Sequence, residues 1–144
     1  MPGHNNRHVY QCPLRWGDMD ALGHVNNSRY VDYLQDARVD LLFRAAGLSG
    51  ESHEDSDSGL LVARHDVTYK APLLFREAPV RIELWVSEIR AAWFSVDYEI
   101  LDLVPEWTVY VEARTKLVPF NFQANCPRRI SETERETLQR LVAA

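Results

Sequence analysis

The chain has little that would cross-link it, hold a metal or cross a membrane. Its 144 residues contain two cysteines, Cys12 and Cys126, which form no Cys-x-x-Cys pair and no Cys/His cluster with zinc spacing. No apolar run approaches the roughly 20 residues that a membrane span needs, and the polar N-terminus lacks the apolar core of a signal peptide. Unpaired thiols are typical of a reducing compartment, so the sequence predicts a cytoplasmic protein.

Glycine-rich phosphate loops and basic stripes are missing as well. The six glycines form neither a Gly-x-Gly-x-x-Gly pattern nor a P-loop. The formal net charge is -5, and no segment carries the row of Lys and Arg that neutralises nucleic-acid phosphates. The composition therefore predicts no cofactor, no metal, no nucleic-acid partner and no membrane insertion.

The chain does have enough apolar material for one core. Hydrophobic residues make up 46% of it and charged residues 26%, as in ordinary soluble domains. The length fits a single domain, which we assign to residues 1–144. Residues 1–7 are expected to be flexible. The acidic segment 49–59 is expected to be a mobile loop, because nothing apolar surrounds its carboxylates and histidine to fix a metal site.

One long amphipathic segment predicts a helix over residues 27–46. Apolar side chains recur there every three or four residues, whereas acidic residues line another face. Asn26 is a favourable N-cap, and Gly47 stands where a C-terminal glycine would end the helix. The apolar stripe consists of Tyr30, Leu34, Ala37, Leu41 and Ala45. A stripe of this width predicts that the helix packs against a large apolar surface.

Several segments have the composition or the two-residue period of a β-strand. They are residues 8–16, 61–70, 80–87, 94–100 and 107–117. We expect each of the last four to bury one face, and their short connections indicate antiparallel hairpins. A capping box at Ser131-Glu132-Thr133-Glu134 predicts a short C-terminal helix. The order predicts an α+β fold in which a five-stranded antiparallel sheet curls around one long helix.

The open edges of such a sheet predict an oligomer. Pairing between the edge strands of two subunits would cover one row of unpaired backbone groups. Trp85, Trp93 and Trp107 add apolar area that one small subunit does not easily bury.

The segment from Arg15 to Tyr30 concentrates polar residues directly before the predicted helix. Either Asp18 or Asp20 has a carboxylate that could attack a carbonyl or activate water, and either could instead cap a turn. The first N–H groups of a helix have no partner within it. The backbone amide near Asn27 is therefore the main candidate for polarising that carbonyl.

Other polar residues have two interpretations each. His24 is either a second group of the site or a loop histidine bonded to backbone, and Asn26 either contributes or only caps the helix. Tyr30 and His65 lie on apolar faces, where they belong to the core, to an interface or to a substrate pocket. Basic residues could meet the phosphates of a nucleotide-containing carrier, or they are solvated surface charges. These are Lys70, Arg76, Arg90, Arg128 and Arg129.

These residues carry a resemblance to a known family. The segment Gly17-Asp18-Met19-Asp20-Ala21-Leu22-Gly23-His24-Val25-Asn26-Asn27-Ser28-Arg29-Tyr30, followed by the helix to Ala46, resembles the hotdog-fold acyl-CoA thioesterases of the 4-hydroxybenzoyl-CoA thioesterase type. The stretch Asp66-Val67-Thr68-Tyr69-Lys70-Ala71-Pro72-Leu73 resembles the family's second strand and its exit turn. The order of elements also matches over about residues 8–122.

The resemblance implies hydrolysis of an acyl thioester, with coenzyme A as part of the substrate. The second Asp of the family's Gly-Asp-x-Asp motif is catalytic, as nucleophile or general base, and it matches Asp20. The carbonyl-polarising amide maps to the backbone of Asn27; some members carry a histidine there, whereas His24 lies three residues earlier. Family sites lie at subunit interfaces, which implies a homodimer or homotetramer in which a partner chain contributes His65 or Tyr69.

Two other functions remain open on the sequence. In a hotdog-fold enoyl-CoA hydratase or dehydratase, Asp20 and His24 would form an acid/base pair, although Ala-Leu-Gly stands between them where the dehydratase-like pattern has Asn-Pro. In a non-catalytic acyl-CoA binding module, the motif would only lead into the helix.

Overall fold

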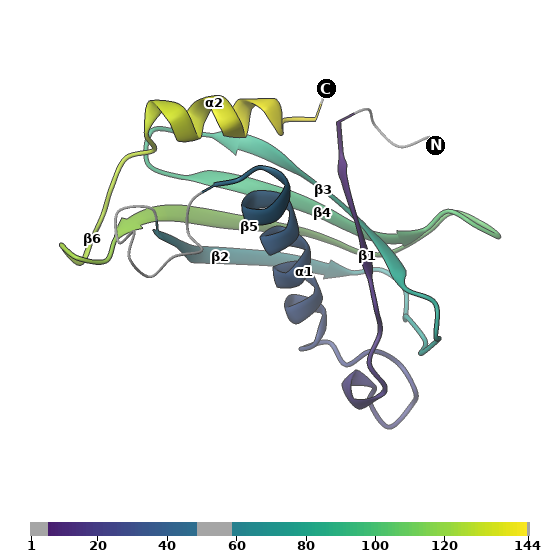
Figure 1. Ribbon diagram of the computed structural model, residues 1–144. Helices are drawn as coiled ribbons and strands as arrows, with labels where there is room; N and C mark the ends of the chain where they lie inside the picture. The colour runs from purple at the N-terminus through teal and green to yellow at the C-terminus, as the bar shows by residue number, and fades with distance from the viewer. Residues whose placement is uncertain (1–5, 49–58, 144) are drawn as a thin grey trace.

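The computed structural model describes residues 6–48 and 59–143, which form a curled antiparallel sheet around one long helix (Figure 1). The two ends of the described chain meet, because the Asn6 side chain donates hydrogen bonds to the carbonyl oxygens of Arg140 and Val142. The elements, in chain order, are β1 (His8–Cys12), η1 (Trp16–Asp18), α1 (Tyr30–Val39), η2 (Asp40–Ala45), β2 (Gly59–Tyr69), β3 (Val80–Ile89), β4 (Phe94–Asp102), β5 (Thr108–Asn121), β6 (Cys126–Pro127) and α2 (Glu132–Arg140).

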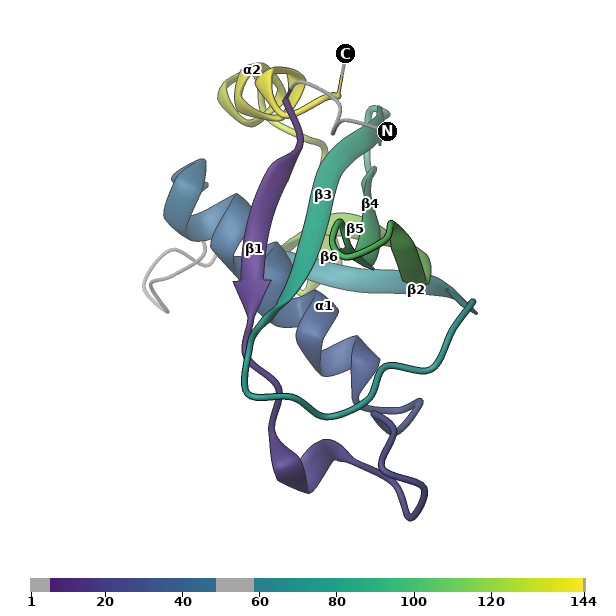
Figure 2. The same ribbon diagram turned by 90° about the vertical axis from the view of Figure 1, so that its right-hand side faces the viewer.

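The strands form one sheet in the order β1-β3-β4-β5-β2, with the short β6 paired to β5. Every pairing is antiparallel, and the hairpins β3–β4 and β4–β5 confirm what their short connections predict. β1 and β2 are the outer strands of this order, and Figure 2 shows the curl of the sheet between them. β2 is the longer outer strand, with 11 residues against 5 in β1.

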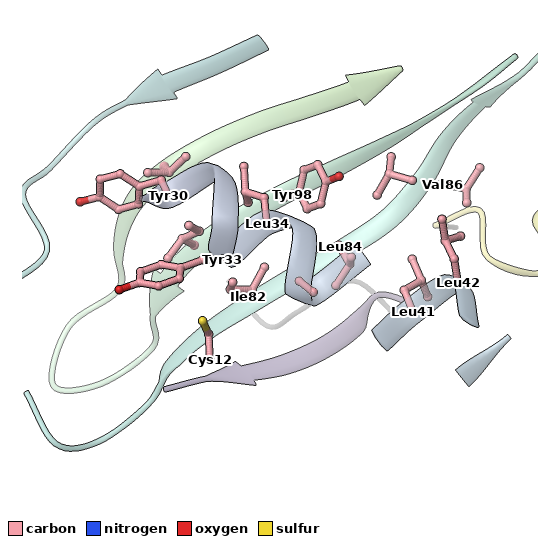
Figure 3. Packing of buried hydrophobic residues seen from close by; sticks show 14 of the residues in the cluster. Cys12, Tyr30, Tyr33, Leu34, Leu41, Leu42, Ile82, Leu84, Val86 and Tyr98 are labelled. Carbon is pink, nitrogen blue, oxygen red and sulfur yellow. The ribbon is translucent and has the colours of Figure 1, made fainter. Parts of the chain in front are cut away.

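The core lies between the helix and the face of the sheet turned toward it, here called the inner face. α1 continues directly into the π-helical η2, and the two contribute 10 and 6 residues. Leu34 and Leu41 of this helix pack in one cluster with Ile82, Leu84 and Tyr98 of the sheet (Figure 3). Each such buried side chain contributes about 1.5–3 kcal/mol relative to leaving it exposed. The predicted hotdog fold is therefore confirmed.

The helix begins three residues later than predicted. α1 starts at Tyr30, and its N-cap, Arg29, makes no capping bond through its side chain. Asn26 caps the preceding turn instead, because its Oδ1 accepts the backbone N–H of Ser28 while its carbonyl accepts the N–H of Arg29. At the other end, Gly47 has a φ of +68°, which confirms the predicted glycine stop.

Two strand predictions are wrong in detail. The first strand ends at Cys12 rather than Trp16, because Pro13 has no N–H for the ladder. β2 was expected to bury one face, yet most of its side chains are exposed on both faces. A bulge between Val62 and Arg64 also shifts its alternation, so that Val62 and His65 both lie opposite inner-face residues of β5.

The C-terminal helix confirms its sequence signal. Ser131 Oγ accepts the N–H of Glu134, whose carboxylate accepts the N–H of Ser131, so both bonds of the capping box are present.

The predictions for residues 1–7 and 49–59 fall mostly outside the described residues. Asn6 and Arg7 are described, and both are held by contacts. The Arg7 guanidinium lies over the Trp85 ring, 3.7 Å from its centroid, and pairs with Glu83 at 3.2 Å. Of the acidic segment, the structure describes Gly59, which begins β2.

Candidate active site

A cleft of about 380 Å³ opens beside the start of α1, and we call it the Asp20 cleft. The loop before α1 forms one wall, and the end of β2 with the residues after it forms the other. Its lining residues are Asp20, His24, Val25, Asn26, Asn27, Tyr30, Tyr69, Lys70, Ala71 and Pro72. Most of the residues that the sequence singles out near the helix therefore share one cavity, the usual form of a small-molecule site.

The loop wall is a small hairpin closed by its own residues. Met19 and Val25 pair in antiparallel fashion, and the N–H of Asp20 donates to the carbonyl of His24 at 2.7 Å. Gly23 turns the chain with a φ of +79°, a conformation that a side chain would strain. The outer side of the hairpin is held by the N–H of Val25, which donates to the carbonyl of Leu73. Local bonds thus set the shape of the turn, and the bond to Leu73 joins this wall to the segment that follows β2.

Asp20 is exposed, and its two carboxylate oxygens differ in their surroundings. Oδ1 accepts the N–H groups of Leu22 at 2.9 Å and His24 at 3.1 Å. Within the described part of the chain, Oδ2 accepts no hydrogen bond. One oxygen therefore fixes the carboxylate on its turn, while the other is available to a molecule in the cleft.

The amide of Asn27 stands out among its neighbours because it has no acceptor. The preceding amides, Val25 and Asn26, donate to the carbonyls of Leu73 and Asp18. The following amides donate to Asn26: Ser28 to its side chain and Arg29 to its carbonyl. Across residues 6–48 and 59–143, no group accepts the N–H of Asn27. Asn27 lines the Asp20 cleft and lies three residues before the first residue of α1, near the positive end of that helix.

The opposite wall is tied to the helix start by Tyr69. Its Oη donates to the carbonyl of Asn27 at 2.8 Å, and its ring lies 5.4 Å from that of Tyr30. Lys70 also lines the cleft, where its Nζ is 3.2 Å from Glu112. Tyr69 therefore reaches the cleft within its own chain, an arrangement that the sequence did not indicate.

Asp18 holds the loop wall to the helix, a contact that the sequence did not indicate. It is only 7% exposed and accepts the hydroxyl of Tyr33 at 2.9 Å. Burial and the neighbouring Asp18 carboxylate both raise the pKa of Tyr33, so this hydroxyl keeps its proton and donates. The Asp18 carbonyl also accepts the N–H of Asn26. Asp18 therefore anchors the loop wall to α1.

Of the remaining candidates, His24 and Asn26 line the Asp20 cleft, whereas His65 lies outside it. His24 lines the cleft; its carbonyl accepts the N–H of Asp20, and its own N–H donates to Asp20 Oδ1. Asn26 also lines the cleft, but its side-chain oxygen accepts the N–H of Ser28 and so stabilises the turn. His65 lies farther along β2, where its Nδ1 is 2.8 Å from Thr115 Oγ1.

Three basic candidates lie away from the cleft in the single chain. Arg128 binds the capping-box Glu134 with two hydrogen bonds of 2.7 and 2.9 Å, at the start of α2. Arg129 is its neighbour, and Arg90 pairs with Glu88 beside the β3–β4 turn. Figure 1 shows α2 at the opposite end of the molecule from the loop wall. A role for Arg90, Arg128 and Arg129 in substrate binding stays a prediction.

The described residues contain neither a membrane-spanning helix nor a metal-binding cluster. No helix among them is long and apolar enough to cross a bilayer. No three His, Cys, Asp or Glu side chains gather there as a metal site would require.

A hotdog sheet, a long central helix and a carboxylate-bearing cleft at its N-terminus define a thioesterase-like architecture. Residues 14–141 match the thioesterase-like superfamily, and the chain belongs to it. No curated protein matches the sequence.

Solved structures agree with this assignment. A Pseudomonas aeruginosa protein provisionally described as a thioesterase is 30% identical, with a TM-score of 0.77 over 90% of this chain and 95% of that one. A Xanthomonas campestris protein provisionally described as an acyl-CoA thioesterase is 30% identical, with a TM-score of 0.67 over 80% and 93%. A predicted thioesterase from Bacillus stearothermophilus has a TM-score of 0.81 over 94% and 96%, and its 19% identity speaks for the fold alone.

Proposed function

We propose that this protein hydrolyses an acyl-CoA thioester to a carboxylic acid and coenzyme A. The observation that carries the proposal is the pairing of two available groups in one cleft: the Asp20 carboxylate and the Asn27 amide. Thioester hydrolysis needs a nucleophile or base and a donor for the carbonyl oxygen. The provisional description of the Xanthomonas campestris protein as an acyl-CoA thioesterase supports the same class of substrate.

In this mechanism the Asn27 N–H binds the carbonyl oxygen of the thioester. Negative charge develops on that oxygen as the carbonyl carbon is attacked, and the positive end of α1 stabilises it. The donor need not give up another hydrogen bond, because it has no acceptor among the residues that the structure describes. Deleting one such donor in enzymes costs roughly 10²–10³-fold in kcat.

Asp20 acts in one of two ways. As a nucleophile, Oδ2 bonds to the carbonyl carbon, the C–S bond breaks, and water then hydrolyses the mixed anhydride. As a general base, Oδ2 takes a proton from a water molecule that attacks directly, and coenzyme A leaves as the thiol. Label found in Asp20 after a single turnover in ¹⁸O-labelled water identifies the nucleophilic route, because only attack of water on the Asp20 side of the anhydride places it there. Label in the product alone is common to the general-base route and to attack of water on the acyl carbon of the anhydride.

We further propose that two chains pair along β2, with a dimer or a pair of dimers as the assembly. β2 is an outer strand of 11 residues and exposes apolar side chains, among them Leu61 and Val62. An exposed, apolar edge of this length favours strand pairing with a second copy. Coenzyme A enters as part of the substrate. The cytoplasmic location remains a prediction from the sequence.

The test is release of free thiol from a panel of acyl-CoAs, with Asp20→Asn as the central variant. This substitution keeps the shape of the side chain and removes the nucleophile or base, so we expect kcat/KM to fall about 10²-fold or more. Asp32→Asn is the matched control, because Asp32 is an exposed carboxylate in the first turn of α1, the helix that follows the Asp20 loop. The control should retain wild-type activity.

The same assay distinguishes the other two functions. Full activity of Asp20→Asn would exclude the proposed role of Asp20. Hydration of an enoyl-CoA without release of thiol would instead identify a hydratase. Binding of acyl-CoA with no turnover above background would identify a binding module.

A further inference from the structure

Arg38 is a buried charged side chain well away from Asp20. Arg38, on α1, is 8% exposed, and its neighbours Ala37 and Leu41 on the same helix are buried. Its Nη1 donates to the hydroxyl of Tyr98 at 3.0 Å. No carboxylate of residues 6–48 or 59–143 forms an ion pair with it. Burying a guanidinium without a counter-charge is unfavourable, so this position calls for an explanation other than stability.

Arg38 is the first member of a chain of hydrogen bonds that we call the Arg38 relay: Arg38, Tyr98, Thr115 and His65. Tyr98 Oη donates to Thr115 Oγ1 at 2.9 Å, and Thr115 Oγ1 is 2.8 Å from His65 Nδ1. Tyr98 and Thr115 are essentially inaccessible to solvent, whereas His65 is exposed on β2. The relay therefore runs from the core to the outer strand of the sheet.

The donor-to-acceptor order of these hydrogen bonds determines which ring nitrogen of His65 carries the hydrogen. Arg38 can only donate, so Tyr98 accepts from it and passes its own hydrogen to Thr115. Thr115 then donates to Nδ1, which leaves a neutral His65 with its hydrogen on Nε2, a tautomer assigned from the network. Burial and the charge of Arg38 both lower the pKa of His65, in agreement with a neutral ring. At the outer end of the relay, His65 Nε2 is thus a hydrogen-bond donor, linked through Thr115 and Tyr98 to the buried positive charge of Arg38.

The relay lies along the same helix and strand as the Asp20 cleft. Tyr30 and Tyr69 line the cleft, and Arg38 is eight residues farther along α1, or about 12 Å. His65 is four residues before Tyr69 on the same face of β2, or about 13 Å. The two elements therefore span the same length from cleft to relay.

The inner face of β2 between these points is open in the single chain. Tyr69 is 49% exposed, Val67 is half-buried and His65 is exposed. The corresponding face of β4, which α1 covers, is buried throughout. An accessible strip, with Val67 in its middle, thus leads from the reacting end, at Asn27, to His65, the outer end of the Arg38 relay.

We propose that this strip holds the acyl chain and that Arg38 and His65 bind a carboxylate at its far end. The substrate class would be thioesters of dicarboxylic acids, and the inference rests on the proposed function. A carboxylate there would accept the Nε2 hydrogen of His65 and supply the counter-charge that Arg38 lacks among the described residues. Charge-assisted bonds of this kind are the strong ones, and a site built for a polar group discriminates sharply against an analogue without it.

The experiment measures kcat/KM for matched pairs of acyl-CoAs of equal chain length, one ending in a methyl group and the other in a carboxylate. We expect wild type to prefer the carboxylate member of at least one pair by about 10-fold or more, the scale of a hydrogen bond to a charged group. Arg38→Met should lower the carboxylate-to-methyl ratio by about 10-fold or more. Arg44→Met, an exposed arginine on the same helix, should leave the ratio unchanged.

A second variant keeps the inference testable if Arg38→Met fails to fold. His65→Phe changes an exposed side chain at the outer end of the relay, and we expect it to lower the same ratio by about 3–10-fold. A wild-type ratio near one for every chain length, or a variant that lowers both members equally, would overturn the inference while leaving the proposed function intact. Hydrolysis of neither member would overturn the proposed function, and this inference with it.

Discussion

The loop before α1 consists of two halves that use the same residue type in opposite ways. In the first half, Trp16–Met19, Asp18 is buried and bonded to Tyr33 on the helix. In the second half, Asp20–Asn27, Asp20 is exposed and bonded through one oxygen to the amides of its own turn. Asp18 is unsuited to attack because it is buried, with Oδ2 bonded to Tyr33 and Oδ1 3.8 Å from Arg29 Nε. Asp20 is suited to it because it is exposed, lines the Asp20 cleft and has an oxygen that accepts no hydrogen bond within the described residues.

A short loop can thus hold reactive groups without a large core of its own. The anchoring half fixes the loop to the helix, so that the half that faces the cleft needs only local bonds to keep its geometry. Catalytic groups are effective when neighbouring contacts hold them within a fraction of an ångström of the productive geometry. Substitutions in the anchoring half should therefore lower mainly stability, and substitutions in the half that faces the cleft should lower mainly activity.

The largest effect is expected where the cleft half supplies its donor. Asn27→Pro removes the amide hydrogen, which no described residue accepts, and should lower kcat by about 10²–10³-fold. Asn27→Ala keeps the amide and removes the side chain, so its kcat should stay within about 3-fold of wild type. Near-ultraviolet circular dichroism would verify that both variants fold. Equal losses in the two variants would show that the side chain, not the amide, is what matters.

A smaller effect is expected in the anchoring half. Tyr33→Phe removes the hydroxyl that Asp18 accepts, and should lower the free energy of unfolding by about 1.5–3 kcal/mol, as for a hydrogen bond to a charged group. We expect kcat/KM to fall by less than about 10-fold, because Asp20 and Asn27 remain. Urea denaturation and thiol release measure the two quantities.

Tyr10→Phe is the control for this variant. Tyr10 packs against the same core, and its hydroxyl makes no hydrogen bond within the described residues. The control should therefore keep its stability within about 0.5 kcal/mol. A Tyr33→Phe protein as stable as this control would contradict the anchoring role.

The smallest effect is expected at the junction of the turn and the helix. Asn26→Ala removes the acceptor for the amide of Ser28 and should cost about 0.5–1 kcal/mol of stability. Because Asn27 is the next residue, we also expect kcat/KM to fall by about 2–10-fold. Asn121→Ala is the matched control, since Asn121 caps a remote turn through the amide of Ala124. Asn121→Ala should lose a similar amount of stability and no activity. An equal loss of kcat/KM in both variants would contradict a specific role of the Asn26 turn in catalysis.

Most of the fold was predictable because burial leaves a period in the sequence. The apolar stripe from Tyr30 to Ala45 and the alternation in β3, β4 and β5 reflect which side chains face the core. β2 was mispredicted for the same reason. Its alternation resembles that of a half-buried strand, but its place at the sheet edge and its bulge depend on pairing with β5.

The candidate site was predictable where its bonds are local. Gly23, Asp20 and Asn26 act within a few residues of themselves, so the motif indicates the turn that they form. The contacts of Asp18 with Tyr33 and of Tyr69 with Asn27 join positions 15 and 42 residues apart. No spacing in the sequence signals them, because they require the helix, loop and sheet to be assembled first.

Residue order predicts the long helix, the antiparallel hairpins, the capping box of α2 and the loop that carries Asp20. These follow from periodicity and from hydrogen bonds between near neighbours. Three other features are visible only in the folded chain: Asp18 anchors the loop, the amide of Asn27 has no acceptor among the described residues, and Arg38 is linked to His65. Each of these depends on side chains from different elements meeting where the sheet curls around the helix.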